Sequence, residues 1–235
     1  MTLALSIVIP IYNEAAIVRS ALVDLIDQTR SHCDSFEVIV AANGCNDGSV
    51  RLVQALQART PELRLIEVDE PNYGRALREG LLAATGAWVI CEEIDLCDSD
   101  FHVEALGLLR AGTTRFVIGS KRAVGAADER PRVRQVATQV MSGLLRLSLG
   151  FKGTDTHGLK AFSREDVLPV VQACQVEHDL FASELVIRAQ RAGIPMKEIP
   201  VRVLEKRPPS VHLFRRVPRV LRDLGRLVRV LGPRA

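Results

Sequence analysis

The segment LALSIVIPIYNE, residues 3 to 14, begins as an apolar strand and ends in a polar turn. Residues 3–11 are mostly Leu, Ile and Val, which predicts a strand that is buried on both faces. Such strands belong to parallel sheets, in which helices cover both faces. Ligands of these sheets bind at the carboxyl ends of the strands, so Asn13 and Glu14, which close this strand, are candidate site residues.

The rest of the chain alternates short Val- and Ile-rich runs with longer runs of helical periodicity. This alternation predicts an α/β fold with a mostly parallel sheet flanked by helices. Further strands are expected at 36–42, 63–68, 87–94, 116–120 and 196–203. Helices are expected at 14–29, 47–57, 73–84, 100–110, 132–149 and 180–192, with another beginning near Ser163.

Two of these helices carry more detailed predictions. Ser163 followed by Asp166 resembles a capping box, in which the serine side chain binds a free backbone amide of the first turn. In the helix at 132–149, the apolar residues that recur at helical spacing are Val136, Val140, Leu144 and Leu147. We expect this apolar face to be buried.

The chain of 235 residues has an ordinary globular composition, with 47% hydrophobic and 25% charged residues, and its length suits one large core. Its net charge of +3 is unevenly distributed. The segment from Arg207 to the end carries eight arginines and one acidic residue, Asp223. Such a basic tail indicates an anionic partner, either a membrane surface or a phosphate-bearing ligand.

The five cysteines are scattered and include no C-x-x-C pair, so we expect reduced thiols rather than a disulfide framework or a structural zinc site. The N-terminus lacks the basic region of a signal peptide, and no apolar run reaches the length of a membrane span. The sequence therefore predicts a cytoplasmic protein, which can be peripheral on the cytoplasmic face of the membrane.

The stretch CEEIDLCDSD, residues 91 to 100, places five carboxylates at the end of a predicted strand. Glu93 and Asp95 are two residues apart, and in a strand this spacing points both side chains to one face. Two such carboxylates can share Mg²⁺ or Mn²⁺, which prefer oxygen ligands and complete their coordination with substrate phosphates. The spacing alone leaves open an ordinary solvated acidic turn.

The neighbouring polar residues have simpler interpretations. Glu92 would point to the opposite face of the strand, and Asp98 or Asp100 is expected to cap the next helix. In the loops after the first two strands, Asn13 and Asp47 could likewise be only caps. Neither G-x-G-x-x-G nor a Walker A sequence is present, so these loops do not hold phosphates in the two best-known ways.

The order of the motifs resembles glycosyltransferase family 2. The chain reads SIVIPIYNE (6–14), NGCNDGS (43–49), YGRALREGLLAATGAWV (73–89), ExD (93–95) and VIGSKR (117–122). Its second half resembles the polyprenyl-phosphate sugar synthase branch, typified by dolichol-phosphate mannosyltransferase. That part of the resemblance rests on Arg134 with Thr138, TDTHGLKAFSRE (154–165), FASELVIRAQRAG (181–193) and KEIPVRV (197–203). The resemblance covers roughly residues 4 to 210 and implies the GT-A fold, a Rossmann-like nucleotide-sugar-binding domain.

The resemblance also implies a role for each matching position. The nucleotide and its diphosphate would be contacted by Pro10, Tyr12, Glu14, Asn43, Asp47, Gly74, Arg75 and Gly80. Glu93 and Asp95 match the family's D-x-D metal site. The acceptor side would be formed by Lys121, Arg134, Thr138 and the loop 155–160, which contains Asp155, His157 and Lys160.

The chain departs from the family pattern at four places. Asn43 replaces an acidic residue, which puts the base preference in doubt, and Glu93 replaces Asp, which puts the metal geometry in doubt. His157 replaces a small residue, and it can be either a structural hydrogen-bonding group or a functional one. The segment KRPPS (206–210) keeps the basic residues of a Gly-Ser-Lys stretch but has prolines instead of the glycine.

The implied reaction is an inverting transfer of a sugar from a GDP- or UDP-sugar, with Mg²⁺ or Mn²⁺ neutralising the leaving diphosphate. A polyprenyl (dolichyl-type) phosphate acceptor is already anionic, and Lys121 and Arg134 would hold it. A soluble or protein-linked hydroxyl acceptor needs a carboxylate base, for which Asp155 is the candidate. A non-catalytic nucleotide-sugar-binding scaffold is the alternative from another class.

The basic tail differs from the rest in composition, which predicts a domain at 1–210 and a C-terminal basic amphipathic helix at 211–235. After Pro218, an apolar stripe is formed by Val220, Leu221, Leu224, Leu227, Val228 and Leu231, and arginines lie opposite. Such a helix lies on anionic lipid, or packs on its own domain or on the partner of a homodimer. No nucleic-acid partner is expected, because only 4% of the residues are aromatic.

Overall fold

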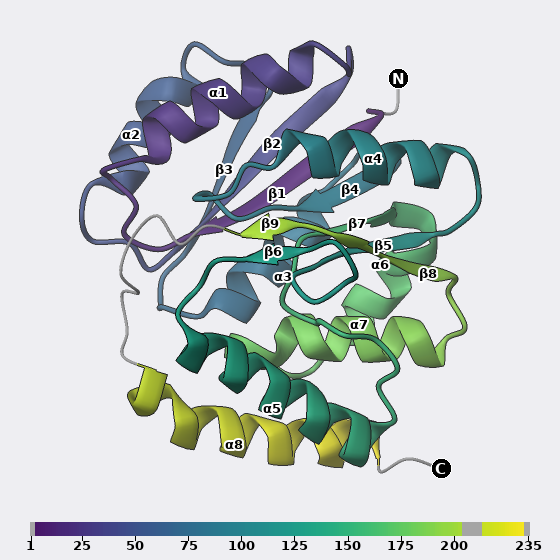
Figure 1. Ribbon diagram of the computed structural model, residues 1–235. Coiled ribbons are helices and arrows are strands. Elements are labelled where there is room, and N and C mark those ends of the chain that lie inside the picture. The colour runs from purple at the N-terminus through teal and green to yellow at the C-terminus, as the bar shows by residue number, and fades with distance from the viewer. Residues whose placement is uncertain (1–2, 204–212, 233–235) are drawn as a thin grey trace.

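The structure is a computed structural model that describes residues 3–203 and 213–232, with the backbone alone at 213–217. It is a mixed α/β fold built on a seven-stranded sheet of order β3-β2-β1-β4-β7-β5-β8 (Figure 1). These strands are β1 (Leu5–Ile11), β2 (Phe36–Asn43), β3 (Leu63–Val68), β4 (Trp88–Cys91), β5 (Phe116–Ser120), β7 (Lys160–Ser163) and β8 (Met196–Pro200). A separate parallel pair joins β6 (Ala127–Asp128) to β9 (Arg202–Val203).

Helices cover both faces of the sheet (Figure 1). One face carries α1 (Val18–Arg30), α2 (Ser49–Gln57) and α4 (Ser99–Arg110). The other carries α3 (Tyr73–Ala83), α6 (Arg164–Ala173) and α7 (Phe181–Arg191), which follows the short 3₁₀ turn η1 (His178–Leu180). Beyond α7, α5 (Arg132–Leu149) and α8 (Leu213–Leu231) lie side by side along one edge of the molecule.

The central strand β1 supplies both cores because successive side chains point to opposite faces. Leu5, Ile7 and Ile9 are buried against α1, α2 and α4, while Val8 is buried against the helices of the other face. Helix α3 approaches the sheet closely, since a Cβ added at Gly80 would lie 2.5 Å from Val8 Cγ1. The predicted fold class is confirmed, including the C-terminal helix.

Three predicted strand or helix boundaries differ from the structure. Helix α1 begins at Val18 rather than residue 14, because residues 12–17 form turns tied to the next loop. Strand β4 ends at Cys91, three residues earlier than predicted, and β8 ends at Pro200. Sequence reasoning missed β7, which runs antiparallel between β4 and β5 and is only four residues long.

Two predictions about side chains in the helices were wrong. Helix α6 begins after Ser163, as expected, but the Ser163 side chain makes no capping hydrogen bond. On α5, Val136, Val140 and Leu147 are exposed rather than buried. The face of α5 that meets the domain carries Ser142, Leu145 and Leu149 instead. Periodicity identifies an apolar face, but it does not identify which face of a helix meets the core.

The apolar stripe of α8 packs on the domain's own core. Leu227 is fully buried in the core cluster of α3, α6 and α7, and Leu224, Val228 and Leu231 pack partly against it. Arg191 of α7 donates hydrogen bonds to the carbonyl oxygens of Leu149 at 3.2 Å and Gly232 at 3.2 Å, and to that of Leu231. One guanidinium therefore satisfies free carbonyls at the ends of both α5 and α8.

The predicted division of the chain at residue 210 stays a prediction, because residues 204–212 lie outside the described part of the structure. The same holds for the segment KRPPS. Among the described residues, no helix is long and apolar enough to cross a bilayer. The cytoplasmic location also stays a prediction.

Replacing Leu227 by Ala tests the packing of α8. We expect a loss of about 2–5 kcal/mol in the free energy of unfolding, because a fully buried leucine leaves a cavity. Leu221, on the same helix but 55% exposed, is the matched control, and Leu221→Ala should change stability little. Chemical denaturation measures both, and equal losses in the two variants would contradict the packing described here.

Candidate active site

Two loops are fastened together at the carboxyl ends of β1 and β2. Asn13 has a left-handed backbone, with φ of 55°, and its side chain exchanges two hydrogen bonds with Asn46. The carboxylate of Asp47 accepts the backbone N–H of Ala15 at 2.9 Å and both the N–H and the hydroxyl of Ser49. Burial works against ionisation, but the Ser49 and Ala15 hydrogen bonds leave the pKa of Asp47 below its ordinary value.

Asp47 therefore does more than cap α2. Its two carboxylate oxygens join the loop after β1 to the start of α2, and Ser49 Oγ adds a further link by accepting the N–H of Glu14 at 2.8 Å. Pro10 is buried in β1, whereas Tyr12 and Glu14 are partly exposed. The hydrogen bonds to Asp47 and Ser49 thus hold the loop that carries Tyr12 and Glu14 at the edge of the sheet.

Asn43 takes part in a buried network at the start of α3. Its side-chain oxygen accepts the backbone N–H of Asn72. The Asn72 side chain accepts the N–H groups of Arg75 at 3.0 Å and His178 at 2.9 Å, and it donates to Glu177 at 2.8 Å. Asn43 thus helps to fix the N-terminus of α3, which Asn72 in turn joins to η1.

Gly74 lies in the same contact between α3 and η1. A Cβ added there would lie 2.6 Å from the carbonyl oxygen of His178 and 2.7 Å from its nitrogen, so only glycine allows the approach. Arg75, the next residue, is exposed at the same end of α3. The glycine of this motif is explained by backbone packing, while the arginine is available to a ligand.

A hollow of about 360 Å³ opens at the carboxyl ends of β2 and β3. It is lined by Ala42, Gly44, Cys45, Asn46, Val50, Glu67, Val68 and Asp69. The hollow adjoins the fastened loops, and its lining combines apolar side chains with the polar side chains of Asn46, Glu67 and Asp69.

The acidic loop after β4 is clamped by Glu92. This buried carboxylate accepts the backbone N–H of Glu93 at 2.8 Å and that of Asp98 at 3.2 Å, and it contacts His102 Nε2 at 2.6 Å. It therefore grips both ends of the segment that carries Glu93 and Asp95. Glu92 is 1% exposed, and its carboxylate is engaged in these contacts.

Asp98 is the predicted cap of α4, since its side chain accepts the N–H of Phe101 at 3.0 Å. The argument that placed Glu93 and Asp95 on one face of a strand is wrong, because β4 ends at Cys91 and both residues lie in the following turn. The turn, rather than strand alternation, brings them together. Burial raises the pKa of Glu93; Lys121 opposes this rise, and the negative charge of Asp95 adds to it.

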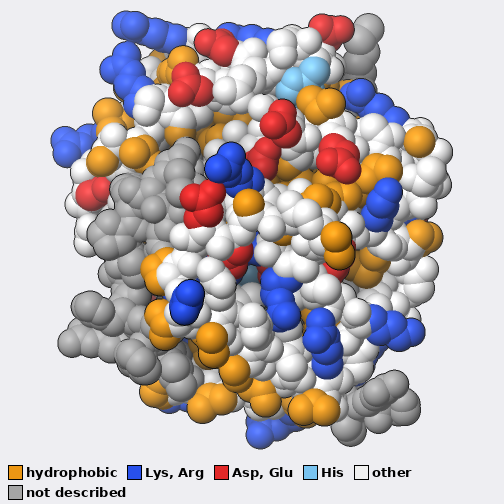
Figure 2. All heavy atoms as spheres, in the orientation of Figure 1, with side chains coloured by type: hydrophobic (Ala, Val, Ile, Leu, Met, Phe, Trp, Pro, Cys, Tyr) orange, Lys and Arg blue, Asp and Glu red, His pale blue; other side chains and the backbone are white. Residues whose placement is uncertain are grey.

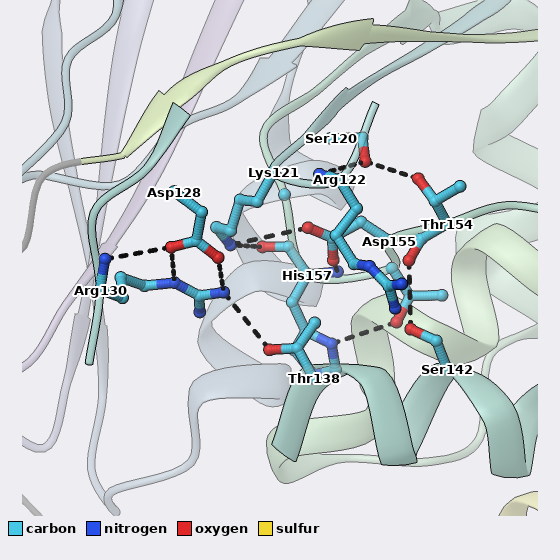
Figure 3. A network of polar contacts seen from close by, with 12 residues as sticks. Ser120, Lys121, Arg122, Asp128, Arg130, Thr138, Ser142, Thr154, Asp155 and His157 are labelled. Atoms are coloured by element: carbon cyan, nitrogen blue, oxygen red, sulfur yellow. Dashed lines mark hydrogen bonds and ion pairs between the residues drawn. The ribbon is translucent and has the colours of Figure 1, made fainter. Parts of the chain in front are cut away.

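Lys121, at the end of β5, faces a second carboxylate from the loop before β7 (Figure 3). Its Nζ lies 3.9 Å from Asp155 Oδ2 and 3.5 Å from the carbonyl oxygen of His157. Burial alone would raise the pKa of Asp155, but Lys121 above all, and the backbone N–H of His157, hold that pKa below its ordinary value. Asp155 Oδ2 is buried and has no hydrogen-bond donor.

Arg130 adds a second cation beside Lys121 (Figure 3). It forms a two-pronged ion pair with Asp128, at 2.8 Å from Nε and 2.7 Å from Nη2, and the same Nη2 also reaches Thr138 Oγ1 at 3.4 Å. The charges of Asp155 and Glu93 both act on Arg130. Thr138 donates back to the carbonyl of Arg134, one turn earlier in α5. Of the predicted acceptor residues, Lys121, Asp155 and Thr138 therefore lie in one network.

His157 is a tether between its loop and η1. Its Nε2 lies 2.9 Å from the carbonyl oxygen of Asp179, so that nitrogen carries the proton, and Nδ1 lies 3.1 Å from Thr156 Oγ1. Burial lowers the pKa of His157, which favours the neutral ring. Nearby, Lys160 donates to the carbonyl of Gly158 at 2.7 Å, and burial lowers the pKa of Lys160. These contacts support the structural interpretation of His157.

Glu93 and Asp95 fit a divalent cation. They supply hard oxygen donors, and their mutual repulsion in a buried site is relieved by positive charge. The described residues contain no group of three or more His, Cys, Asp or Glu side chains arranged to hold a metal. Mg²⁺ at phosphate-binding sites takes one or two protein carboxylates and completes its coordination with water and phosphate oxygens.

The family model described as "Glycosyl transferase family 2" matches residues 6–168. The chain belongs to glycosyl transferase family 2. The resemblance to this family that the sequence showed is confirmed. The matched region contains the carboxyl ends of strands β1 to β7, whereas β8 and β9 lie beyond it.

Two curated relatives agree with this assignment. The chain is 33% identical over 215 residues to glycosyltransferase AglD of Haloferax volcanii, covering 89% of this chain and 34% of the relative. It is 26% identical over 213 residues to a dolichyl-phosphate beta-glucosyltransferase of Dictyostelium discoideum, covering 84% of this chain and 65% of the relative. The chain thus spans about one third of the first relative and somewhat less than two thirds of the second.

A solved structure confirms the GT-A fold. Glucosyl-3-phosphoglycerate synthase of Mycobacterium tuberculosis, in complex with Mn²⁺, UDP-glucose and phosphoglyceric acid, superimposes with a TM-score of 0.68 at 19% identity. The match covers 99% of this chain and 81% of that one.

Sequence reasoning missed several residues that shape this family 2 site. Glu92 and His102 are buried together beneath the acidic loop. Tyr73 is half-buried near Glu93 and Asp95, and burial, together with the charges of those two residues, raises its pKa. Arg130 was also missed. Its only sequence signal is its place in the charged run ADERPR before α5. Its ion-pair partner Asp128 lies in the same run, and the charges of Asp155 and Glu93, which also act on it, come from other segments.

The clamp formed by Glu92 can be tested without substrate. In Glu92→Gln, the amide keeps one acceptor oxygen, so one of the two backbone N–H bonds to residues 93 and 98 is weakened. We expect faster amide hydrogen exchange at those two residues by about tenfold or more. Exchange in the strand β1 is the internal reference. Unchanged protection at both residues would show that the carboxylate does not order the loop.

Proposed function

We propose that this domain transfers a sugar from a nucleotide-diphosphate sugar to the phosphate of a polyprenyl-type lipid, with inversion at the anomeric carbon. The observation that carries the proposal is the meeting of a carboxylate pair, Glu93 and Asp95, with the cations Lys121 and Arg130 around the buried Asp155. The first group suits a metal-bound diphosphate, and the second suits an anionic acceptor.

The donor would occupy the side of the site formed by β1, β2 and β3. The hollow at the ends of β2 and β3 would take the nucleoside, with the loop of Tyr12 and Glu14 beside it. The exposed Arg75 at the start of α3 would meet the diphosphate, where the positive end of the helix dipole also favours anions.

Glu93 and Asp95 would hold Mg²⁺ or Mn²⁺. The bound ion supplies positive charge that neutralises the leaving diphosphate. The Glu92 clamp keeps the two carboxylates in place, and the buried surroundings strengthen their attraction for a cation. The Mn²⁺ and UDP-glucose in the neighbouring structure support this arrangement, as that protein has the same fold.

The acceptor would be held by Lys121 and Arg130, with Arg134 and Thr138 one turn into α5. A phosphate monoester is already anionic at neutral pH, so its oxygen needs no strong base. Asp155 is better suited to orienting Lys121 than to removing a proton, because its pKa lies below the ordinary value. The relative that acts on dolichyl phosphate supports a lipid phosphate acceptor.

A soluble phosphate acceptor is the second candidate. Lys121 and Arg130 recognise a phosphate whatever is attached to it, and the neighbouring structure contains phosphoglyceric acid. Comparing turnover with a short-chain prenyl phosphate and with phosphoglyceric acid separates the two candidates.

Replacing Asp95 by Asn tests the metal site. We expect Mn²⁺-dependent hydrolysis or transfer from UDP- or GDP-sugars to fall by about a hundredfold or more, because the variant loses one charged ligand. Asp100→Asn is the matched control, since Asp100 belongs to the same acidic stretch but is exposed on α4. Wild-type turnover in Asp95→Asn would contradict the proposal, and so would an equal loss in both variants.

A thermal-shift screen of nucleotide sugars tests the donor site. A ligand that binds only the folded protein raises the unfolding temperature, so the correct nucleotide sugar should stabilise the wild type in the presence of Mn²⁺. Asp95→Asn should lose the Mn²⁺-dependent part of the shift. If no UDP- or GDP-sugar shifts the wild type, the proposed donor class is wrong.

A further inference from the structure

Helix α5 has an apolar face that the domain does not cover. Val133, Val136 and Val140 are 53%, 55% and 57% exposed, and Leu147 is 84% exposed. Their spacing of three, four and seven residues places them on one side of the helix. They make up half of the eight large exposed hydrophobic side chains in the described residues. We call these four residues the α5 stripe.

The α5 stripe is distinct from the surface by which α5 packs on the domain. Ser142, Leu145 and Leu149 face the core, so α5 is apolar on two opposite sides. Figure 2 shows hydrophobic side chains gathered along the lower edge of the molecule, where Figure 1 places α5 and α8. A continuous apolar face of this kind marks an interaction surface.

The charge around the stripe has one sign. Helix α5 contains no acidic residue, and its Arg132 and Arg146 are exposed beside the stripe. The neighbouring α8 exposes Arg219, Arg222, Arg226 and Arg229, while its single acid, Asp223, is buried. Just before α5, the carboxylates of Asp128 and Glu129 are occupied by ion pairs with arginines. Acidic side chains instead gather in the upper half of the face in Figure 2.

The stripe begins at the candidate acceptor site. Val133 lies between Arg130 and Arg134, and Val136 is two residues from Thr138, which Arg130 contacts. The apolar surface therefore runs from the acceptor cations outward along α5. A lipid phosphate held by those cations would have its hydrocarbon chain next to the stripe.

We propose that the α5 stripe docks the protein on an anionic lipid bilayer, with the flanking arginines of α5 and α8 at the headgroups. Apolar residues bordered by arginines are the features of helices that lie in the membrane interface. The inference rests on the proposed lipid phosphate acceptor, and it identifies where the protein meets that lipid. It also assigns the membrane contact to α5, because the apolar stripe of α8 is used in packing on the domain.

A second copy of the chain fits this surface poorly. In a symmetric dimer through the stripe, the arginines of α5 and α8 would face the same arginines of the other copy, with no exposed carboxylate on either helix among the side chains described. Anionic headgroups supply the charge that a second copy lacks.

The test is co-sedimentation of the full chain with vesicles of equimolar phosphatidylcholine and phosphatidylglycerol, compared with phosphatidylcholine alone. The variant Val140→Gln with Leu147→Gln removes apolar character from the half of the stripe that lies farther from the candidate acceptor site. Val103→Gln is the matched control, because Val103 is equally exposed, at 56%, on α4. Thermal unfolding checks that all variants are folded.

We expect the wild type and Val103→Gln to bind anionic vesicles alike, the double variant to bind about tenfold or more weakly, and neutral vesicles to bind the wild type weakly. Equal binding by the double variant, or no preference of the wild type for anionic vesicles, would overturn the proposal. So would analytical ultracentrifugation showing a wild-type dimer that the double variant dissociates.

A turnover assay separates this inference from the proposed function. With a water-soluble short-chain prenyl phosphate, the double variant should keep wild-type turnover, whereas with long-chain acceptor in vesicles its turnover should fall with its binding. If the wild type binds vesicles through the stripe but transfers no sugar to either acceptor, the proposed function fails and the docking surface stands.

Discussion

The parallel register of β1 between β2 and β4 is the constraint on which the rest of the site depends. Ile11 pairs with Ala42, so β1 and β2 end level and their loops are fastened through Asn13 and Asp47. Val8 pairs with Cys91, so β4 stops three residues short of the end of β1. The acidic turn therefore begins beside the last residues of β1, where the backbone N–H of Glu92 bonds the carbonyl oxygen of Val8.

Buried charge gives this edge its chemistry. Glu93 and Asp155 form a cluster with Lys121 and Lys160 that is largely shielded from solvent. The pKa of Glu93 is raised, and that of Lys160 is lowered. Each shift has burial as its first cause, so both charged forms are disfavoured by lost water. Ligands of opposite sign, a cation for the carboxylate pair and a phosphate for the lysine, would relieve that cost. The proposed metal and acceptor phosphate would supply those charges.

The two arginine-rich helices, α5 and α8, show what hydrophobic periodicity in the sequence predicts and what it does not. The stripe of α8 and that of α5 were both visible as helical periodicity, but one packs on the core and the other is exposed. Hydrophobic spacing specifies a face, whereas burial depends on what lies opposite. The same limit applies to Asn43 and His157. Each stands at a departure from the family pattern, and each forms a hydrogen bond with a segment distant in sequence that periodicity could not reveal.

The sequence by itself determined the alternation of strands and helices, the family, and the set of polar residues at the strand ends, because these depend on local periodicity and on the order of motifs. Only the tertiary structure decided that β7 enters antiparallel between β4 and β5, and that a turn, not a strand, brings Glu93 and Asp95 together. It also decided that Glu92, His102 and Arg130 support the site. The place of β7 depends on pairing between segments far apart in the chain, whereas Glu92 and Arg130 meet their partners through the backbone geometry of a turn or a helix start. Local periodicity does not specify which group will satisfy a buried charge or cover an apolar face.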